Sequence, residues 1–173
     1  MFTPALALLL AACGSALPQE AVGVDASDDH IVDRADLLTP AEEERLETSL
    51  QSLEDRTSDQ LVVVTIQDLE DRPIEQWGLD LGNDWGVGHK DLDNGVLLIV
   101  APSDRQARIE VGLGLEGLLT DQTAQAIIDE ELLPHFRKGD FAGGIDKGVV
   151  EISELLMSDT SRPQRAHRKD ELK

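Results

Sequence analysis

The chain has 173 residues, of which 40% are hydrophobic, and it carries a formal net charge of −20. This length and apolar share suffice for one packed core, so we expect a single globular domain with flanking tails. A surface this acidic repels phosphate backbones, which argues against nucleic acid as a partner. It favours cations, basic protein surfaces or a divalent metal, and it is equally consistent with a role in solubility alone.

The N-terminus predicts a route to the cell envelope. Residues 5–12 form an apolar run that is too short to span a bilayer, and residues 10–13 read Leu-Ala-Ala-Cys. This pattern resembles the signal and lipobox of bacterial lipoproteins. The resemblance implies that Cys13, the only cysteine, is lipidated and tethers the protein to the membrane on the periplasmic side. Gly14 after it favours the outer membrane. Basic residues before the run are missing, which leaves an upstream start or an ordinary signal peptide as alternatives.

The remaining boundaries follow from composition. After the lipobox, small and acidic residues without periodicity predict a flexible tether, and a basic, unpatterned segment closes the chain. Residues 162–173 hold five basic and two acidic residues, so everything before them carries −23. We divide the chain into a signal and lipobox at 1–13, a tether at 14–29, a folded domain at 30–158 and a disordered basic tail at 159–173.

The first half of the domain begins with an extended piece at residues 31–33. A helix over 40–56 follows, because Thr39 is a good N-cap, Pro40 suits the first helical position and Glu42 completes a capping box. Residues 61–66 read LVVVTI, a continuous apolar run typical of a central strand covered on both faces.

The second half places two more strands beside that one. A helix opens at residues 73–74 and ends near Trp85, and it leads to a buried strand at 95–101, parallel to the first. A tight turn at 102–104 returns the chain as an antiparallel strand at 106–111.

Two further helices complete the domain. One begins at Asp121 and is stopped or bent by Pro134, and the last covers 141–157 with apolar residues at helical spacing. The order of elements predicts an α/β fold, a three-layer α/β/α sandwich on a mixed, Rossmann-like sheet.

Several motifs resemble the TPM domain family. They are the strand LVVVT at 61–65, Trp85-Gly86-x-Gly88, Asp93-Asn94-Gly95, RIEVGLGLEG at 108–117 and Leu119-Thr120-Asp121. The resemblance covers about His30 to Met157, with departures at Arg34 and Leu113, where the family often has an aromatic residue. The family includes thylakoid acid phosphatase-like and photosystem II repair proteins, an acetylcholine-receptor auxiliary protein and many bacterial membrane-associated proteins. It implies a Rossmann-like sandwich.

The acidic, glycine-rich loops around residues 95 and 112 are the candidate site. Asp93 and the side-chain oxygen of Asn94 are hard ligands suited to Ca²⁺ or Mg²⁺, but the spacing is not that of an EF-hand. Any metal must therefore be completed from other loops, and Asp33 and Glu116 are the expected partners. The alternatives stay open: residues 94–95 form only a tight turn, and Glu116 accepts hydrogen bonds within its own loop.

Two functions are consistent with these features. The first is a membrane-tethered, cation-binding interaction or maintenance factor for membrane protein assemblies. The second is a metal-dependent acid phosphatase acting on phosphomonoesters, as the resemblance implies for a plant member. Recognised phosphatase motifs are missing from the sequence, and the acidic surface disfavours phosphate arrival, so we expect the first function.

Overall fold

The computed structural model describes residues 29–159, which form one mixed sheet covered by helices on both faces. The strands lie in the order β1, β2, β3, β4, where β1 is Ile31–Asp33, β2 is Gln60–Thr65, β3 is Gly95–Ala101 and β4 is Gln106–Val111. β1, β2 and β3 are parallel, and β4 returns antiparallel to β3. The predicted α/β/α sandwich is confirmed.

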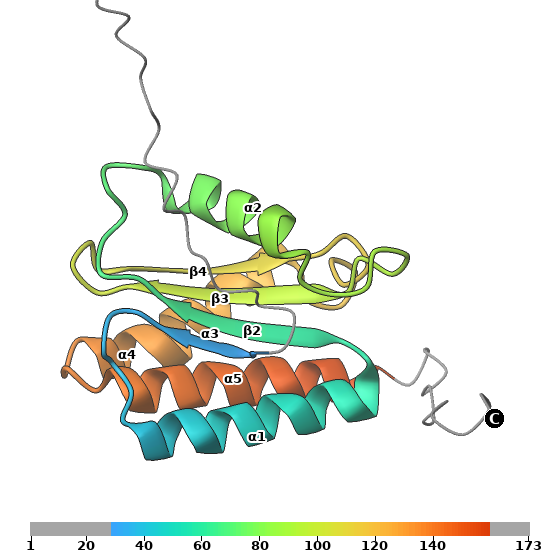
Figure 1. Ribbon diagram of the computed structural model, residues 1–173, viewed down its shortest axis with the longest axis horizontal. Helices are drawn as coiled ribbons and strands as arrows, with labels where there is room; N and C mark the ends of the chain where they lie inside the picture. The colour runs from blue at the N-terminus through green and yellow to red at the C-terminus, as the bar shows by residue number, and fades with distance from the viewer. Residues whose placement is uncertain (1–28, 160–173) are drawn as a thin grey trace, which may run out of the picture.

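Helices cover the two faces unequally (Figure 1). α2, Ile74–Trp85, lies alone on one face. The other face is covered by α1, Pro40–Thr57, by α5, Phe141–Ser158, and by a segment that runs from α3, Asp121–Ile127, through η1, Ile128–Leu132, to α4, Leu133–Phe136. The sheet is therefore buried on both sides, which explains why the sequences of β2 and β3 are apolar almost throughout.

The core divides into two clusters along the alternation of the strands. Val62 and Leu97 point toward α2, whereas Val63 and Leu98 point toward α1 and α5. All seven residues of β3 are buried. β3 is thus the strand to which the loops of the candidate site are attached most rigidly.

The boundary of α1 follows its capping residues. The backbone N–H of Thr39 donates to Glu42 Oε2 over 2.7 Å, and Pro40 occupies the first turn as expected. Leu46, Leu50 and Leu53 form its buried stripe. α1 ends at Thr57, one residue later than predicted.

The helix predicted to start at Asp121 is interrupted differently from expectation. It widens into the π-helical stretch η1 before Pro134, and α4 then continues for one turn. Proline has no backbone N–H to give to the preceding turn, so a change of helical pitch just before it costs fewer hydrogen bonds than a regular helix would.

His30, immediately before β1, is a buried polar residue that joins the strand to α1. Its ring nitrogens lie 2.7 Å from Glu47 Oε1 and 2.7 Å from Glu54 Oε2, and its backbone N–H donates to the other oxygen of Glu47. The side chain is only 4% exposed. One histidine therefore attaches a three-residue strand to a helix on the neighbouring layer.

Two glycines at the end of α2 differ only in backbone conformation and give a stability prediction. Gly82 is helical and Gly86, the C-cap, has φ of +63°, while an added Cβ would meet no atom within 4 Å at either position. We expect Gly82→Ala to raise the free energy of unfolding by about 0.5–1 kcal/mol through helix propensity. Gly86→Ala should lower it by about 1 kcal/mol because L-residues are strained there. Urea unfolding of both variants checks this, and an equal sign for the two would contradict it.

In the part of the chain that the structure describes, no helix is both long and apolar enough to cross a membrane. Residues 1–28 and 160–173 lie outside the described part of the chain. The predicted signal and lipobox with Cys13, the tether apart from Asp29 and the tail apart from Asp159 are therefore not described.

Candidate functional site

Two loops meet at the end of the sheet where β3 begins. One joins α2 to β3 and the other follows β4, and they adjoin because β4 runs antiparallel, pairing Val111 with Val96. The backbone N–H of Gly112 donates to Gly95 O over 2.8 Å, and that of Gly114 donates to Asp93 O over 3.0 Å. The two motifs noted in the sequence thus form one continuous backbone contact.

Glycines at this contact are required by the closeness of the two chains. A Cβ on Gly112 would lie 2.2 Å from Asp93 O, and one on Gly114 would lie 1.9 Å from Leu92 O. Asp93 itself has φ of +45°, a left-handed conformation that aspartate tolerates better than most residues. Its carboxylate is left exposed beside the joined loops.

Asn94 holds the first loop to the helix end before β2. Its Oδ1 accepts from the backbone N–H of His89 over 2.8 Å, and its Nδ2 donates to Ser58 O and, over 3.0 Å, to Asp59 Oδ1. The residue is 1% exposed. These bonds give Asn94 an architectural role, whereas the turn expected at residues 94–95 lies earlier, over 90–93, and Gly95 is already the first residue of β3.

A groove of about 380 Å³ opens between α2 and these loops. Two glycines one turn apart on α2, Gly78 and Gly82, line it, and a Cβ on Gly78 would come within 2.9 Å of Glu110 Oε2. The groove therefore has room because two positions of α2 at this end of the sheet, Gly78 and Gly82, carry no side chain.

Three carboxylates line this groove, and no lysine or arginine does. Glu110, on β4, accepts from Arg108 Nε over 2.7 Å. Asp93 and Glu116 are exposed, and neither carboxylate forms a hydrogen bond or ion pair with any residue of the described segment. The groove thus offers one partly neutralised and two unengaged carboxylates.

Exposed leucines surround the same groove. Leu79 on α2 is 49% exposed and Leu113 in the second loop is 73% exposed, and both line it. Leu92, also exposed, lies in the first loop against Gly114. Large exposed apolar residues that gather at one place on a soluble domain are typical of interaction surfaces.

The structure brings together part of the predicted metal-binding set. Asp93 and Glu116 line one groove, but Asp33 lies at the opposite end of the sheet, paired in register with Thr65. Thr65 pairs with Val100 and Gln60 with Gly95, so five strand residues, roughly 17 Å at about 3.3 Å per residue, separate the level of Asp33 from that of Gly95, and Asp93 lies two residues before Gly95.

Asp33 is engaged where it lies. One of its oxygens accepts from Thr65 Oγ1 and the other from the backbone N–H of Leu38 over 2.8 Å. Within residues 29–159, no three histidine, cysteine or acidic side chains are grouped closely enough to enclose a metal ion. Any cation in the groove would need water or a partner to complete its coordination.

Sequence reasoning missed Glu110 and the two glycines of α2. Glu110 appeared only as a polar position of an alternating strand, although it shares a strand face with Arg108. Gly78 and Gly82 are four residues apart, so they lie on the same helix face, and this spacing was the signal that two neighbouring positions of that face carry no side chain.

Comparisons with known proteins agree with this architecture. The sequence matches the TPM domain over residues 31–155. It is similar to the N-terminal domain of a protein from P. gingivalis, with 33% identity over 83% of this chain and 92% of that chain and a TM-score of 0.75. The BA42 protein of Bizionia argentinensis is 22% identical, covering 69% and 81%, with a TM-score of 0.60.

A third solved structure shares the fold. The N-terminal domain of the cg2496 protein from Corynebacterium glutamicum is 16% identical, covering 86% of this chain and 93% of that chain, with a TM-score of 0.62. A comparison with curated proteins found no match.

Proposed function

The chain belongs to the TPM domain family, and from that premise we propose that it is a membrane-tethered interaction or maintenance factor. Its acidic groove binds a divalent cation, Ca²⁺ or Mg²⁺, and engages a membrane protein or assembly. The lipid on Cys13 supplies the tether and places the domain on the periplasmic side of a bacterial envelope.

The observation that carries this proposal is the association of unengaged carboxylates with exposed leucines around one groove. A hydrated metal site alone does not require exposed leucines such as Leu79 and Leu113 at its rim. An apolar rim around a charged centre is instead the composition of a protein-binding surface. The partner expected from it presents a basic or cation-bridged centre and an apolar surround.

The cation role rests on Asp93 and Glu116. Both supply carboxylate oxygens, the ligands that Ca²⁺ and Mg²⁺ prefer, and neither is engaged elsewhere in the described segment. With two or three carboxylates and no enclosing cage, the ion keeps much of its water, so we propose weak binding that strengthens when a partner adds ligands. Asn94 and Asp33, held by other bonds, support the loops and the sheet rather than the ion.

The alternative is a metal-dependent acid phosphatase. We rank it lower because a phosphomonoester entering the groove would meet three carboxylates and no arginine or lysine. A metal would have to offset all of that repulsion before it could activate water.

Calorimetric titration of the purified chain with Ca²⁺ and with Mg²⁺ tests the site. We expect saturable binding that weakens about tenfold, or about 1.4 kcal/mol, in Asp93→Asn, because one of two unengaged carboxylates loses its charge. The matched control is Asp55→Asn, an exposed aspartate on α1 across the sheet. Binding that falls equally in both variants would show only the effect of net charge and would contradict the site.

The same preparations distinguish the two functions. Hydrolysis of para-nitrophenyl phosphate that requires the cation and is lost in Asp93→Asn would support the phosphatase. Cation binding without turnover supports the interaction factor.

A further inference from the structure

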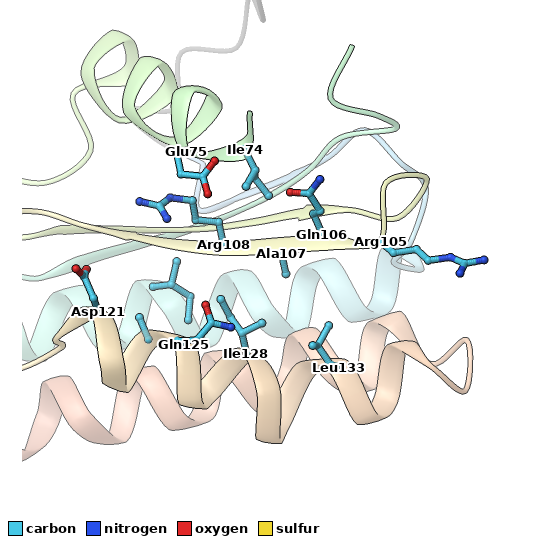
Figure 2. Close-up of a pocket in the computed structure, with 12 residues that line it drawn as sticks. Ile74, Glu75, Arg105, Gln106, Ala107, Arg108, Asp121, Gln125, Ile128 and Leu133 are labelled. Carbon is cyan, nitrogen blue, oxygen red and sulfur yellow. The ribbon is translucent and has the colours of Figure 1, made fainter. Parts of the chain in front are cut away.

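The outer side of β4 is a free edge of the sheet. The strand order ends at β4. A groove of about 430 Å³ runs along it, between Ile74 and Glu75 of α2 on one side and Asp121 and Gln125 of α3 on the other. Figure 2 shows the strand residues lying between these two helical walls.

The hydrogen-bonding pattern of the ladder determines which backbone groups of β4 face this groove. Gly112 donates to Gly95, so that pair exchanges hydrogen bonds with β3. Hydrogen-bonded and non-hydrogen-bonded pairs alternate in an antiparallel ladder. The N–H and C=O groups of Ala107, Ile109 and Val111 are therefore directed away from β3, toward the free edge.

A second cavity, of about 570 Å³, lies at the start of β4. Its walls combine apolar and aromatic residues with Arg105, Gln106 and Arg137, and the rings of Phe136 and Phe141 lie 5.1 Å apart. Arg105, Gln106 and Leu133 line both this cavity and the groove. The two hollows therefore adjoin, and we call the pair the β4 trough.

Charge is distributed unevenly along the β4 trough. Arg105 and Arg137 stand at the cavity end, and neither forms an ion pair with any residue that the structure describes, whereas Arg108 is paired with Glu110. Glu75 and Asp121 line the groove further along β4, and Figure 2 shows Arg105 and Asp121 far apart along the strand direction. The trough thus has a basic end beside the two phenylalanine rings and an acidic stretch beyond it.

We propose that the β4 trough binds the C-terminal segment of a partner polypeptide as an added strand. The partner's terminal carboxylate lies between Arg105 and Arg137, and its last side chain, which is apolar, enters the cavity lined by Phe136 and Phe141. The segment runs antiparallel to β4, because its C-terminus lies at the N-terminal end of that strand. Main-chain hydrogen bonds to Ala107 and Ile109 supply affinity, and the cavity supplies specificity.

The acidic residues further along the β4 trough indicate which side chain the bound segment carries several residues before its C-terminus. A strand of about 3.3 Å per residue brings a side chain several residues before the carboxylate near Glu75 and Asp121, so a basic residue fits there. This site is separate from the cation groove, which lies at the other end of β4 around Glu110.

Fluorescence anisotropy with labelled peptides tests the proposal on the full chain. The probes are four peptides, Arg-Thr-Val-Thr-Val followed by Val, Leu, Ile or Phe, each with a free carboxylate and with a C-terminal amide. We expect at least one carboxylate form to bind about tenfold more tightly than its amide, because charge-assisted bonds to two arginines are lost in the amide. Absence of that preference in all four pairs would overturn the proposal.

Two variants and one control locate the binding. Arg105→Gln combined with Arg137→Gln should abolish the tenfold preference, and Arg56→Gln, an exposed arginine on α1, should leave it unchanged. Ala107→Pro removes an outward N–H without removing a bond to β3, and it should weaken both peptide forms about tenfold. Thermal unfolding of each variant confirms that it is folded.

Amide chemical-shift changes provide an independent readout in the unaltered protein. Changes confined to β4, α3 and the loop before β4 support the proposal. Changes centred on Asp93 and Glu116 would overturn it, as would concentration-dependent dimerisation that the peptide disrupts, since the strand edge would then bind a second copy of the chain.

Discussion

Asn94→Ala is expected to lower the free energy of unfolding by about 3–4 kcal/mol. The substitution removes every side-chain bond that joins the first loop to the helix end before β2, and it leaves the carbonyl of Ser58 and the N–H of His89 without their partner. Asn94 itself is buried, whereas the two groups that it leaves unsatisfied are only partly buried, so they cost about 1–2 kcal/mol each. Urea unfolding followed by tryptophan fluorescence measures the change.

Asn94→Asp separates the architectural role from metal ligation. A carboxylate at this position would face the side chain of Asp59 at 3.0 Å from the former amide nitrogen, in a site 1% exposed. We expect it to destabilise the fold as well, with no gain in cation affinity. Tighter Ca²⁺ binding by this variant would mean that Asn94 belongs to the metal site after all.

His30→Ala is expected to lower the free energy of unfolding by about 2–3 kcal/mol at slightly acidic pH, because it leaves two carboxylates facing each other without the imidazolium between them. Glu47 and Glu54 are partly exposed, which limits the loss. The control is Leu37→Ala, a partly buried residue on the same connection to α1 without a charge. Thermal unfolding of both variants measures how much stability each one loses.

Stability should also depend on pH through His30. The hydrogen bond to Glu54 raises the pKa of His30 above its ordinary 6.5, burial opposes it, and Glu47 adds to the increase. A raised pKa contributes stability that is complete below 6.5 and is lost as pH rises through the folded-state value. We expect His30→Gln to flatten the decline in unfolding free energy above neutral pH. An unchanged slope would show that another group titrates there.

The sequence determined the sheet and its layers because hydrophobic patterning is local. The apolar runs at β2 and β3 required cover on both faces, and the capping box at Thr39 and Glu42 predicted the start of α1 to the residue. The π-helical stretch η1 was not predictable from periodicity, since its residues keep the apolar spacing of an ordinary helix up to Pro134.

The candidate site was predicted only in part because it depends on which strand ends lie at the same end of the sheet. Asp93 and Glu116 line one groove, since a hairpin connects the strands that their loops flank. Asp33 was expected beside them. Because β1 is parallel to β3, however, the carboxyl end of β1 lies at the end of the sheet opposite to the start of β3. Glu110 lines the groove because it lies against Gly78 of α2. That contact depends on packing between elements that are distant in sequence.

The sheet has two open margins, and each is protected from self-association in a different way. β1 is three residues long and ends with Asp33, whose carboxylate is engaged, so it offers little template for a second molecule. β4 is twice as long, but it carries Arg108 and Glu110 on one face. Charged side chains on an edge strand discourage edge-to-edge pairing of whole domains. A partly unfolded chain that loses α2 would expose one face of β4 in addition to its free edge, and we expect aggregation to begin there.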